Sequence, residues 1–199
     1  MNSSVIEHLK RRRTQYALGR NVTLDKQSLT TLIEDAIKHA PSSFNAQSSR
    51  AVILFGEQSV KFWALVKQEL GKAVPAESFA QTAAKLDGFA AGVGTVLFYE
   101  DQNVIKGLQE KFALYADNFP VWSEHSTAMA QLAVWTTLAE AGIGASLQHY
   151  NPLVDDAARQ AWNIPASWKL RAQMPFGSHE AGFNEKFFMD DGQRFIVAA

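Results

Sequence analysis

The 199-residue sequence contains no cysteine. Without a thiol the chain cannot form a disulfide scaffold, a cysteine-ligated zinc or iron–sulfur site, or a cysteine nucleophile. It also lacks an excess of one charge, because 19 Lys and Arg stand against 20 Asp and Glu. This balance argues against a protein that binds nucleic acid through a basic surface. The remaining composition, 47% hydrophobic and 20% charged, predicts one globular domain over residues 1–199, and we expect it in the cytoplasm.

A long uninterrupted apolar run is missing too. Residues 126–147 contain one charged side chain, Glu140, and approach the length of about 20 apolar residues that spans a bilayer. Polar side chains at Gln131, Thr136 and Thr137 interrupt this run, and the N-terminal segment lacks the apolar stretch of a signal peptide. The segment therefore predicts a buried helix, and no membrane partner is expected.

Several catalytic motifs have no counterpart in the sequence. There is no His-Glu-x-x-His pair, no Gly-x-Ser-x-Gly elbow and no Walker-type phosphate loop. The histidines, none of them paired at metal-ligand spacing, are His8, His39, His125, His149 and His179. We therefore predict no metal site.

Apolar residues recur at helical or strand spacing along most of the chain. Helices are predicted at residues 3–10, 26–39, 57–71, 76–87, 101–115, 122–141 and 153–162. Strands are predicted at residues 51–55, 95–99, 144–149 and 169–176. Ser3 or Ser4 is expected to cap the first helix, and Pro41 to stop the second. This order of elements predicts an α+β or α/β fold with mixed strand directions.

The predicted helix at 122–141 is apolar around most of its circumference. Such a helix must be covered on all sides. Because a chain of this length has limited material for that purpose, we infer that a second subunit shares the helix. Residues 178–199 have no helical period, and we expect them to form an extended arm over that neighbour.

Four cations, Lys10 to Arg13, precede Thr14 where the first predicted helix ends. Guanidinium groups match phosphate oxygens in a bidentate way, and a hydroxyl adds a donor. Cations at a helix end also interact favourably with its free carbonyl groups, so a solvated helix end is the alternative. A nucleic-acid patch is a third interpretation, weakened by the acidic residues elsewhere in the chain.

A polar loop over residues 41–50 lies between a predicted helix and a predicted strand. Its hydroxyl and amide groups could hydrogen-bond several edges of a planar heteroaromatic ligand. Polar loops also commonly do nothing more than turn the chain. The loop by itself leaves both interpretations open.

Two further groups of residues have simple structural explanations. Gly142 and Gly144 follow a helix, whereas a dinucleotide fingerprint needs glycines after a strand, so a Rossmann site is rejected. His149 nearby is by itself more typical of a structural histidine than of a base or ligand. In the polar C-terminal segment, Lys186 and Arg194 are most simply solvated cations.

Four motifs, in the same order, resemble the FMN-dependent nitroreductase family. Residues 12–16 (Arg-Arg-Thr-Gln-Tyr) are similar to its Arg-Arg-Ser-x-Arg/Lys element, and residues 40–47 to its Ala-Pro-Ser-x-x-Asn-x-Gln loop. Residues 139–144 resemble the end of its central helix, and residues 175–177 its last core strand. The stretches closest to the fatty-acid-repression branch of the family are residues 115–123, 145–152 and 168–177.

The resemblance implies an α+β fold with a mixed central sheet flanked by helices. It also implies an intertwined homodimer with two FMN sites at the subunit interface and an extended C-terminal arm at about 178–199. By position, Arg12, Arg13 and Thr14 would hold the phosphate and ribityl chain, with Lys186 as a further phosphate cation.

The isoalloxazine ring would be held by a second set of residues. Those that would reach its edge from the other subunit are Ser42, Ser43, Asn45 and Gln47, and those beside its N5 are His149 and Tyr150. Tyr16 stands where many relatives have Arg or Lys, so it cannot supply the cation that stabilises negative charge near N1 and O2. We name Lys85 as its substitute.

The reaction that the resemblance implies is ping-pong. Hydride passes from NADH or NADPH through flavin N5 to an electron-poor small molecule such as a nitroaromatic or a quinone. The flavin carries the chemistry, so no catalytic side chain is named. Alternatively, the chain is a flavin-binding regulatory or sequestering protein whose reductase activity is incidental.

Tyr115, Phe119 and Trp122 are a hypothetical aromatic wall over the flavin. Ordinary core and dimer packing is the alternative for the same three residues. Unchanged acceptor preference after Phe119→Ala would rule out the wall.

Overall fold

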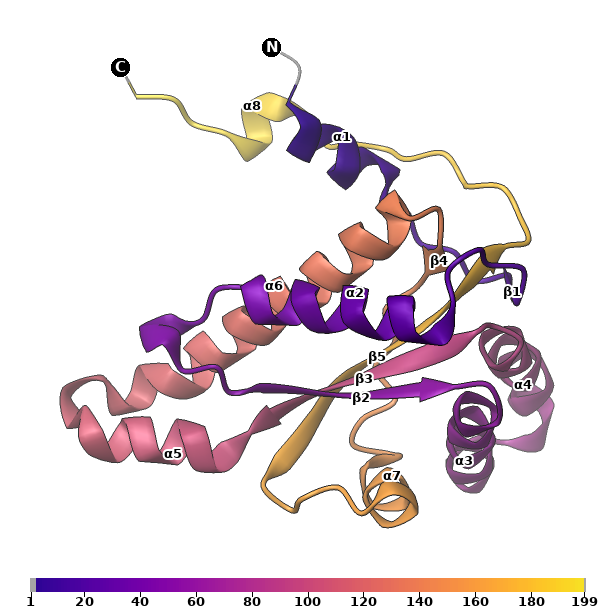
Figure 1. The fold of residues 1–199 in the computed structure, drawn as a ribbon, viewed down its shortest axis with the longest axis horizontal. Coiled ribbons are helices and arrows are strands. Elements are labelled where there is room, and N and C mark those ends of the chain that lie inside the picture. Colours follow the sequence, from indigo (N-terminus) through magenta and orange to yellow (C-terminus); the bar gives the residue numbers. More distant parts are fainter. Residues whose placement is uncertain (1–2, 199) are drawn as a thin grey trace.

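A five-stranded sheet lies at the centre of the protein (Figure 1). The computed structural model describes residues 3–198, apart from the side chains of residues 76–78. The strands are β1 (Leu18–Gly19), β2 (Ser49–Phe55), β3 (Gly94–Asp101), β4 (Gly144–Ala145) and β5 (Trp168–His179). Their hydrogen-bonded order is β1-β5-β3-β2, with β4 also paired to β5. These strand pairs are antiparallel, and an isolated bridge between Thr14 and Ala145 is parallel.

Three strands pair with β5 at successive positions. Residues 168–176 of β5 pair with β3, Phe176 and Gly177 with β4, and Ser178 and His179 with β1. This strand therefore joins segments from the beginning, the middle and the end of the chain.

Helices cover both faces of the sheet (Figure 1). Side chains of a strand alternate between faces, and in β3 Leu97 and Tyr99 pack toward α3, α4 and α7, whereas Val96 and Phe98 pack toward α2 and α6. Because both faces are covered, Gly94 to Glu100 are all buried. This double burial explains why β3 appears in the sequence as a continuous apolar run.

The helices agree with the predicted segments within a few residues. They are α1 (Ser4–Arg11), α2 (Lys26–His39), α3 (Glu57–Ala73), α4 (Ala76–Ala90), α5 (Gln102–Lys111), α6 (Phe119–Glu140), α7 (Asp155–Trp162) and α8 (Asp191–Arg194). Two 3₁₀ helices, η1 (Ser43–Asn45) and η2 (Ala113–Asn118), lie in connections. The short elements β1 and α8 were not predicted, since two and four residues are too few to show a period.

Four local expectations were wrong. The helix predicted at 101–115 ends at Lys111, because the chain leaves helical geometry at Phe112. The long helix begins at Phe119 rather than at residue 122, with Pro120 in its first turn, where a missing N–H costs nothing. The strand predicted at 144–149 is only two residues long. Ser3 occupies the N-cap position of α1 but its side chain makes no capping hydrogen bond.

One face of α6 remains open within the single chain. Val134 and Leu138 are buried against the sheet, whereas Leu132 is 45% exposed and Met129 38% exposed. The sequence predicts that α6 is covered on all sides. This chain alone covers only part of its circumference.

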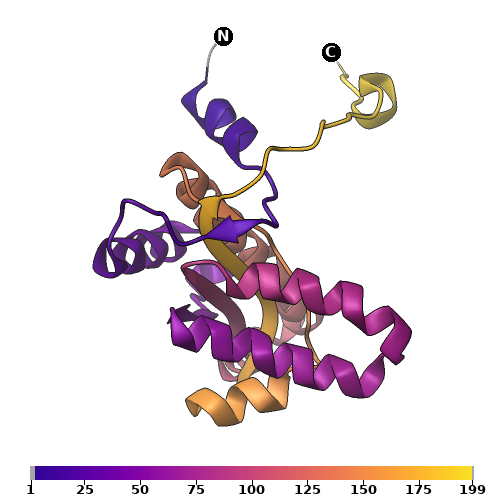
Figure 2. The same cartoon turned by 90° about the vertical axis from the view of Figure 1, so that its right-hand side faces the viewer.

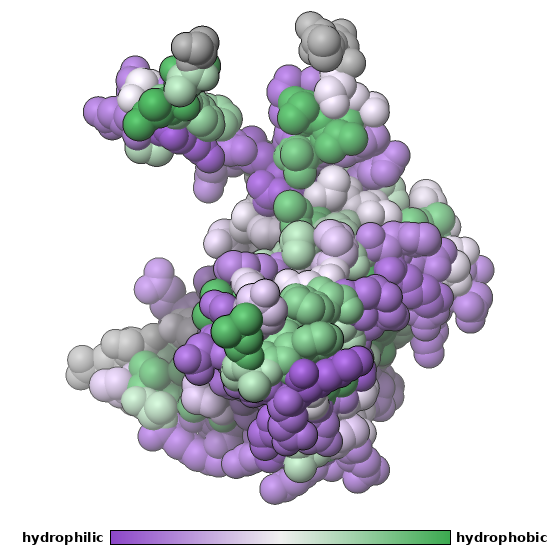
Figure 3. All heavy atoms as spheres, turned by 90° about the vertical axis from the view of Figure 1, so that its left-hand side faces the viewer, coloured by the Kyte–Doolittle hydropathy of each residue, from purple (hydrophilic) through white to green (hydrophobic). Residues whose placement is uncertain are grey.

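The two ends of the chain project from the body on the same side (Figure 2). No residue of α1 is buried, and residues 181–198 are all exposed. Hydrophobic side chains gather on both projections, with a notch between them (Figure 3). The predicted arm therefore begins after β5, since residues 178 and 179 belong to that strand, and residue 199 lies outside the described part.

In residues 3–198, none of the helices combines the length and the apolar character needed to cross a membrane. The longest, α6, buries four polar side chains, namely Ser123, Ser126, Thr127 and Gln131.

Candidate functional site

A cleft of about 370 Å³ lies between the segment that follows α1 and the C-terminal arm. It is lined by Arg12, Arg13, Thr14, Tyr16, Gly182, Asn184 and Lys186. Three of these are cations, and none of the described lining residues is acidic. The structure thus brings together the residues that the sequence assigned to a phosphate.

The two arginines of the cleft are held by aromatic and backbone contacts. The guanidinium carbon of Arg12 lies 4.4 Å from the centre of the Trp135 ring of α6, and that of Arg13 lies 5.5 Å from the centre of the Phe183 ring. Arg13 also donates a hydrogen bond to the Asn184 carbonyl. Burial, followed by repulsion from Arg13, lowers the pKa of Arg12. A bound anion would relieve both effects.

Three other predicted residues, Lys85, His149 and Tyr150, do not line the cleft. The Lys85 ammonium lies 4.9 Å from the centre of the Tyr16 ring. Burial, and secondarily the negative charge of an ionised Tyr16, raises the pKa of Tyr150. His149, next to Tyr150, has an exposed side chain. Lys85 is therefore a cation beside Tyr16, where the sequence lacks one.

The other four predicted residues, Ser42, Ser43, Asn45 and Gln47, lie in the loop between α2 and β2. The Gln47 backbone N–H donates to Ser42 Oγ at 3.0 Å and closes this loop. Phe44, Asn45 and Gln47 have φ angles of 57°, 51° and 47°, a left-handed conformation that costs non-glycine residues energy. Such a conformation persists only where surrounding contacts impose it, and residues of this kind cluster at functional sites.

The Phe44 side chain fixes this loop against three other aromatic rings. Its ring centre lies 4.9 Å from that of Phe112, 5.4 Å from that of Phe119 and 5.9 Å from that of Trp122. Phe44 nevertheless remains 52% exposed. Sequence reasoning did not name Phe44 as a site residue, although it lies inside the Ser-Ser-Phe-Asn motif.

Tyr115, Phe119 and Trp122 lie together in one aromatic cluster but differ in their exposure to solvent. Phe119 is buried at 2% exposure, so core packing is the role that the structure supports for this residue. Tyr115 is 42% exposed and lies 6.3 Å from Phe44, ring centre to ring centre. The accessible rings of this cluster are therefore those of Phe44 and Tyr115.

The cationic cleft and the Ser42–Gln47 loop lie far apart on the same helix. Arg12 contacts Trp135 near the end of α6, whereas Phe44 contacts Trp122 near its beginning. Thirteen residues at 1.5 Å rise each separate these points by about 20 Å. Within one chain they are two separate groups of residues, which are half-sites under the function proposed below.

A buried carboxyl group anchors the exit of the loop. Glu100 of β3 is fully buried and accepts hydrogen bonds from Ser48 Oγ, at 2.5 Å, and from Ser49 Oγ. Arg50 adds to this anchor by donating to the Gln47 carbonyl at 2.6 Å and to Asp101 at 3.2 Å. Burial raises the pKa of Glu100, opposed by the two serine hydroxyls, and Glu124 raises it further.

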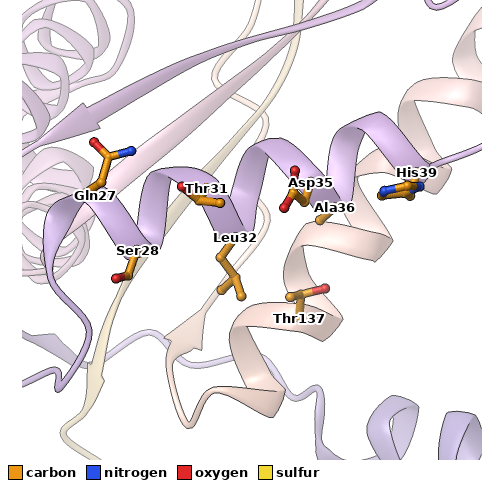
Figure 4. Close-up of a pocket in the computed structure, with 8 residues that line it drawn as sticks. All are labelled: Gln27, Ser28, Thr31, Leu32, Asp35, Ala36, His39 and Thr137. Atoms are coloured by element: carbon orange, nitrogen blue, oxygen red, sulfur yellow. The ribbon is translucent and has the colours of Figure 1, made fainter.

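A larger hollow of about 610 Å³ lies between α2 and α6 (Figure 4). Its lining residues are Gln27, Ser28, Thr31, Leu32, Asp35, Ala36, His39 and Thr137. None of the predicted site residues is among them, and the only formal charge is that of Asp35. The hollow therefore does not offer the cations that a phosphate needs. In the part of the chain that is described, no three His, Asp or Glu side chains are placed to hold a metal ion.

The sheet covered on both faces, the central helix α6 and the cationic cleft under a projecting arm define an α+β protein of the nitroreductase type. The chain belongs to the nitroreductase family, whose family model matches residues 9–178. This membership confirms the resemblance inferred from the sequence motifs.

The relatives agree with this assignment. Nitroreductase FRM2 of Saccharomyces cerevisiae is 34% identical over 185 residues, which cover 90% of each chain. Nitroreductase CinD of Lactococcus lactis, solved with chloramphenicol, is 54% identical with a TM-score of 0.91 and covers 98% of this chain and 100% of its own. CinD has also been solved with 4-nitrophenol, with 53% identity and a TM-score of 0.90 over the same shares of both chains. A Desulfovibrio desulfuricans protein solved with FMN shares the fold, with 13% identity, a TM-score of 0.70, and 100% and 99% coverage.

The buried Glu100 generates a pH-dependent prediction. Its pKa is raised in the folded state, so the folded state loses stability relative to the unfolded state as pH rises above the ordinary value of 4.5. The variant Glu100→Gln keeps an uncharged hydrogen-bonding group and removes this loss. Denaturant unfolding from pH 4.5 to 8 should show wild type losing stability relative to Glu100→Gln. Glu110→Gln, at an exposed position, should follow wild type, and parallel curves for wild type and Glu100→Gln would contradict the prediction.

Proposed function

We propose that the protein is an FMN-dependent oxidoreductase that transfers hydride from NADH or NADPH to nitroaromatic or quinone acceptors by a ping-pong mechanism. The observation that carries this proposal is the cleft lined by Arg12, Arg13 and Lys186 without a described acidic neighbour. Family membership supports the oxidoreductase class, and the FMN complex of the Desulfovibrio protein supports the cofactor.

The residues of the cleft fit the phosphate end of FMN. Two guanidinium groups and one ammonium group offer charge-assisted donors, and the Thr14 hydroxyl adds a neutral one. Arg12 and Arg13 repel one another without an anion, so phosphate binding stabilises both charged side chains. From this end the ribityl chain would run past Tyr16.

The isoalloxazine ring would then lie near Tyr16, Lys85, His149 and Tyr150. Lys85 is the cation on this side, and a positive charge near N1 and O2 stabilises the negative charge that develops there on reduction. FMN supplies hydride acceptance and donation at N5 when bound. The protein side chains orient the two substrates over that atom and exclude water, so no acid, base or nucleophile is required.

A second subunit would complete each site. Ser42, Ser43, Asn45 and Gln47 lie near the beginning of α6, about 20 Å along the helix from the contact between Arg12 and Trp135. In a homodimer these residues of one subunit would face the cleft of the other. The exposed apolar side chains on α6, α1 and the arm support this assembly, because separate chains would leave them in water.

The acceptor class is argued from the accessible aromatic rings. Phe44 and Tyr115 are exposed aromatic residues on which a planar electron-poor ring can stack. CinD, at 54% and 53% identity, was solved with the nitroaromatic compounds chloramphenicol and 4-nitrophenol. Without cysteine the fold needs no disulfide and hence no oxidising compartment, and we propose the cytoplasm.

The first experiment records the visible spectrum of the purified protein after it has been mixed with FMN and freed of excess. Flavin bands that bleach on anaerobic addition of NADH or NADPH, and return on addition of 4-nitrophenol or a quinone, are expected. Failure to take up FMN would overturn the proposal. Bleaching followed by slow reoxidation with every acceptor would instead indicate a flavin-binding regulatory protein.

Arg12→Ala should weaken FMN binding by about tenfold to a hundredfold, the loss of one charge-assisted hydrogen bond. Riboflavin, which lacks the phosphate, should bind wild type and variant alike. The matched control is Arg11→Ala, which removes an exposed cation that does not line the cleft. Flavin fluorescence titration measures the FMN affinity of each variant. Equal losses of affinity in Arg11→Ala and Arg12→Ala would show that the net positive charge of the segment matters, and not the position of Arg12 in the cleft.

Leu132→Glu should convert the dimer into monomers, because a carboxylate replaces a half-exposed apolar side chain on α6. FMN binding should fall with it, since each site needs both subunits. Light scattering after size-exclusion chromatography measures the mass, and Val60→Glu on α3 is the control at a similarly exposed apolar position. A Leu132→Glu protein that remains dimeric would show that this face lies outside the interface.

A further inference from the structure

Gln15 is a buried residue between two exposed neighbours of the cationic cleft. Thr14 and Tyr16 line the cleft, whereas Gln15 points away from it and is 3% exposed. Its backbone N–H donates to the Ala145 carbonyl at 2.9 Å, which fixes the segment against β4. The side chain is therefore aimed into the protein and not at a ligand.

The Gln15 carboxamide binds the start of the C-terminal arm. Its Nε2 donates to the Ala181 carbonyl at 2.6 Å, and its Oε1 accepts from the Ala17 backbone N–H at 3.0 Å. Nε2 also lies 3.5 Å from Nδ1 of His179. One side chain thus joins the N-terminal segment to the point where the arm leaves β5.

Gly144 makes room for this side chain. A Cβ atom at position 144 would lie 2.9 Å from Cγ of Gln15 and 3.2 Å from Nδ1 of His179. A close approach of this kind allows no side chain other than hydrogen without displacing Gln15. The Gly-Ile-Gly motif at 142–144, which has no dinucleotide role, is explained at Gly144 by this packing.

The arm depends on a few polar contacts near its start. No side chain in residues 181–198 is buried, so no apolar core in this chain fixes its direction. The hydrogen bonds to the N-terminal segment run from the Glu180 N–H to the Ala17 carbonyl, at 3.1 Å, from Gln15 to the Ala181 carbonyl and from Arg13 to the Asn184 carbonyl. The Arg13 guanidinium also lies against the Phe183 ring. Lys186 follows two residues after Asn184.

We propose that Gln15 is a positioning residue for the phosphate site. Its carboxamide sets the direction of the arm so that Lys186 meets Arg12 and Arg13 on the same anion. Gln15 acts through Lys186 and does not touch the flavin. This inference rests on the proposed function, because the anion is taken to be the phosphate of FMN.

Replacing the Gln15 carboxamide with a carboxylate tests its hydrogen bond to the Ala181 carbonyl. The variant Gln15→Glu retains an acceptor for Ala17 but places a carboxylate oxygen against the Ala181 carbonyl, where a donor is needed. Amide hydrogen exchange of the flavin-free protein should become faster at Glu180, the first residue of the arm, whose N–H donates to the Ala17 carbonyl beside the lost contact. Gln109→Glu is the matched control, since Gln109 likewise donates to a backbone carbonyl, that of Ala116, but on α5. Unchanged exchange in the arm of Gln15→Glu would overturn the proposal.

Flavin affinities then connect the arm to the phosphate. Gln15→Glu and Lys186→Ala should each weaken FMN binding about tenfold, leave riboflavin binding unchanged, and show no further loss when combined. Additive losses, or equal losses for riboflavin, would show that Gln15 does not act through Lys186. Wild type that binds no FMN would overturn the proposed function itself, an outcome distinct from additive losses.

Discussion

The pairing of β5 with three other strands is the constraint on which the rest of the structure depends. It joins β1, β4 and the start of the arm at one end of the sheet. The chains approach so closely there that a Cβ atom at Gly177 would lie 2.2 Å from the Gly19 carbonyl oxygen. Because of this pairing, Arg12 and Lys186, which are separated by most of the sequence, line one cleft.

The helix α6 sets the distance between the two half-sites. One end supports Trp135 under Arg12, and the other supports the aromatic cluster around Phe44. A helix is stiff at this length, so the separation of about 20 Å cannot close within one chain. The homodimer of the proposed function would bring a loop and a cleft from different subunits together.

Both half-sites contain an arrangement that costs energy: left-handed backbone in the loop and two adjacent cations in the cleft. Contacts within the protein hold both arrangements in place. The left-handed residues of the Ser42–Gln47 loop are fixed by the ring of Phe44 on one side and by Glu100, through Ser48 and Ser49, on the other. In the cleft, Arg12 and Arg13 repel one another, yet aromatic rings and a backbone carbonyl orient them. Preorganised groups of this kind lower the cost of ordering on binding.

The sequence by itself determined the helices and strands with a clear apolar period, the family, and the two motifs that form the half-sites. These features depend on neighbours within a few residues, as at 26–39, where the predicted and observed helix coincide. Only the tertiary structure decided that Gln15 is buried, that Glu100 holds Ser48 and Ser49, and that Lys85 lies beside Tyr16. Each of these depends on contacts between residues distant in the chain, as Gln15 and Ala181 show, and no local periodicity records such a pairing.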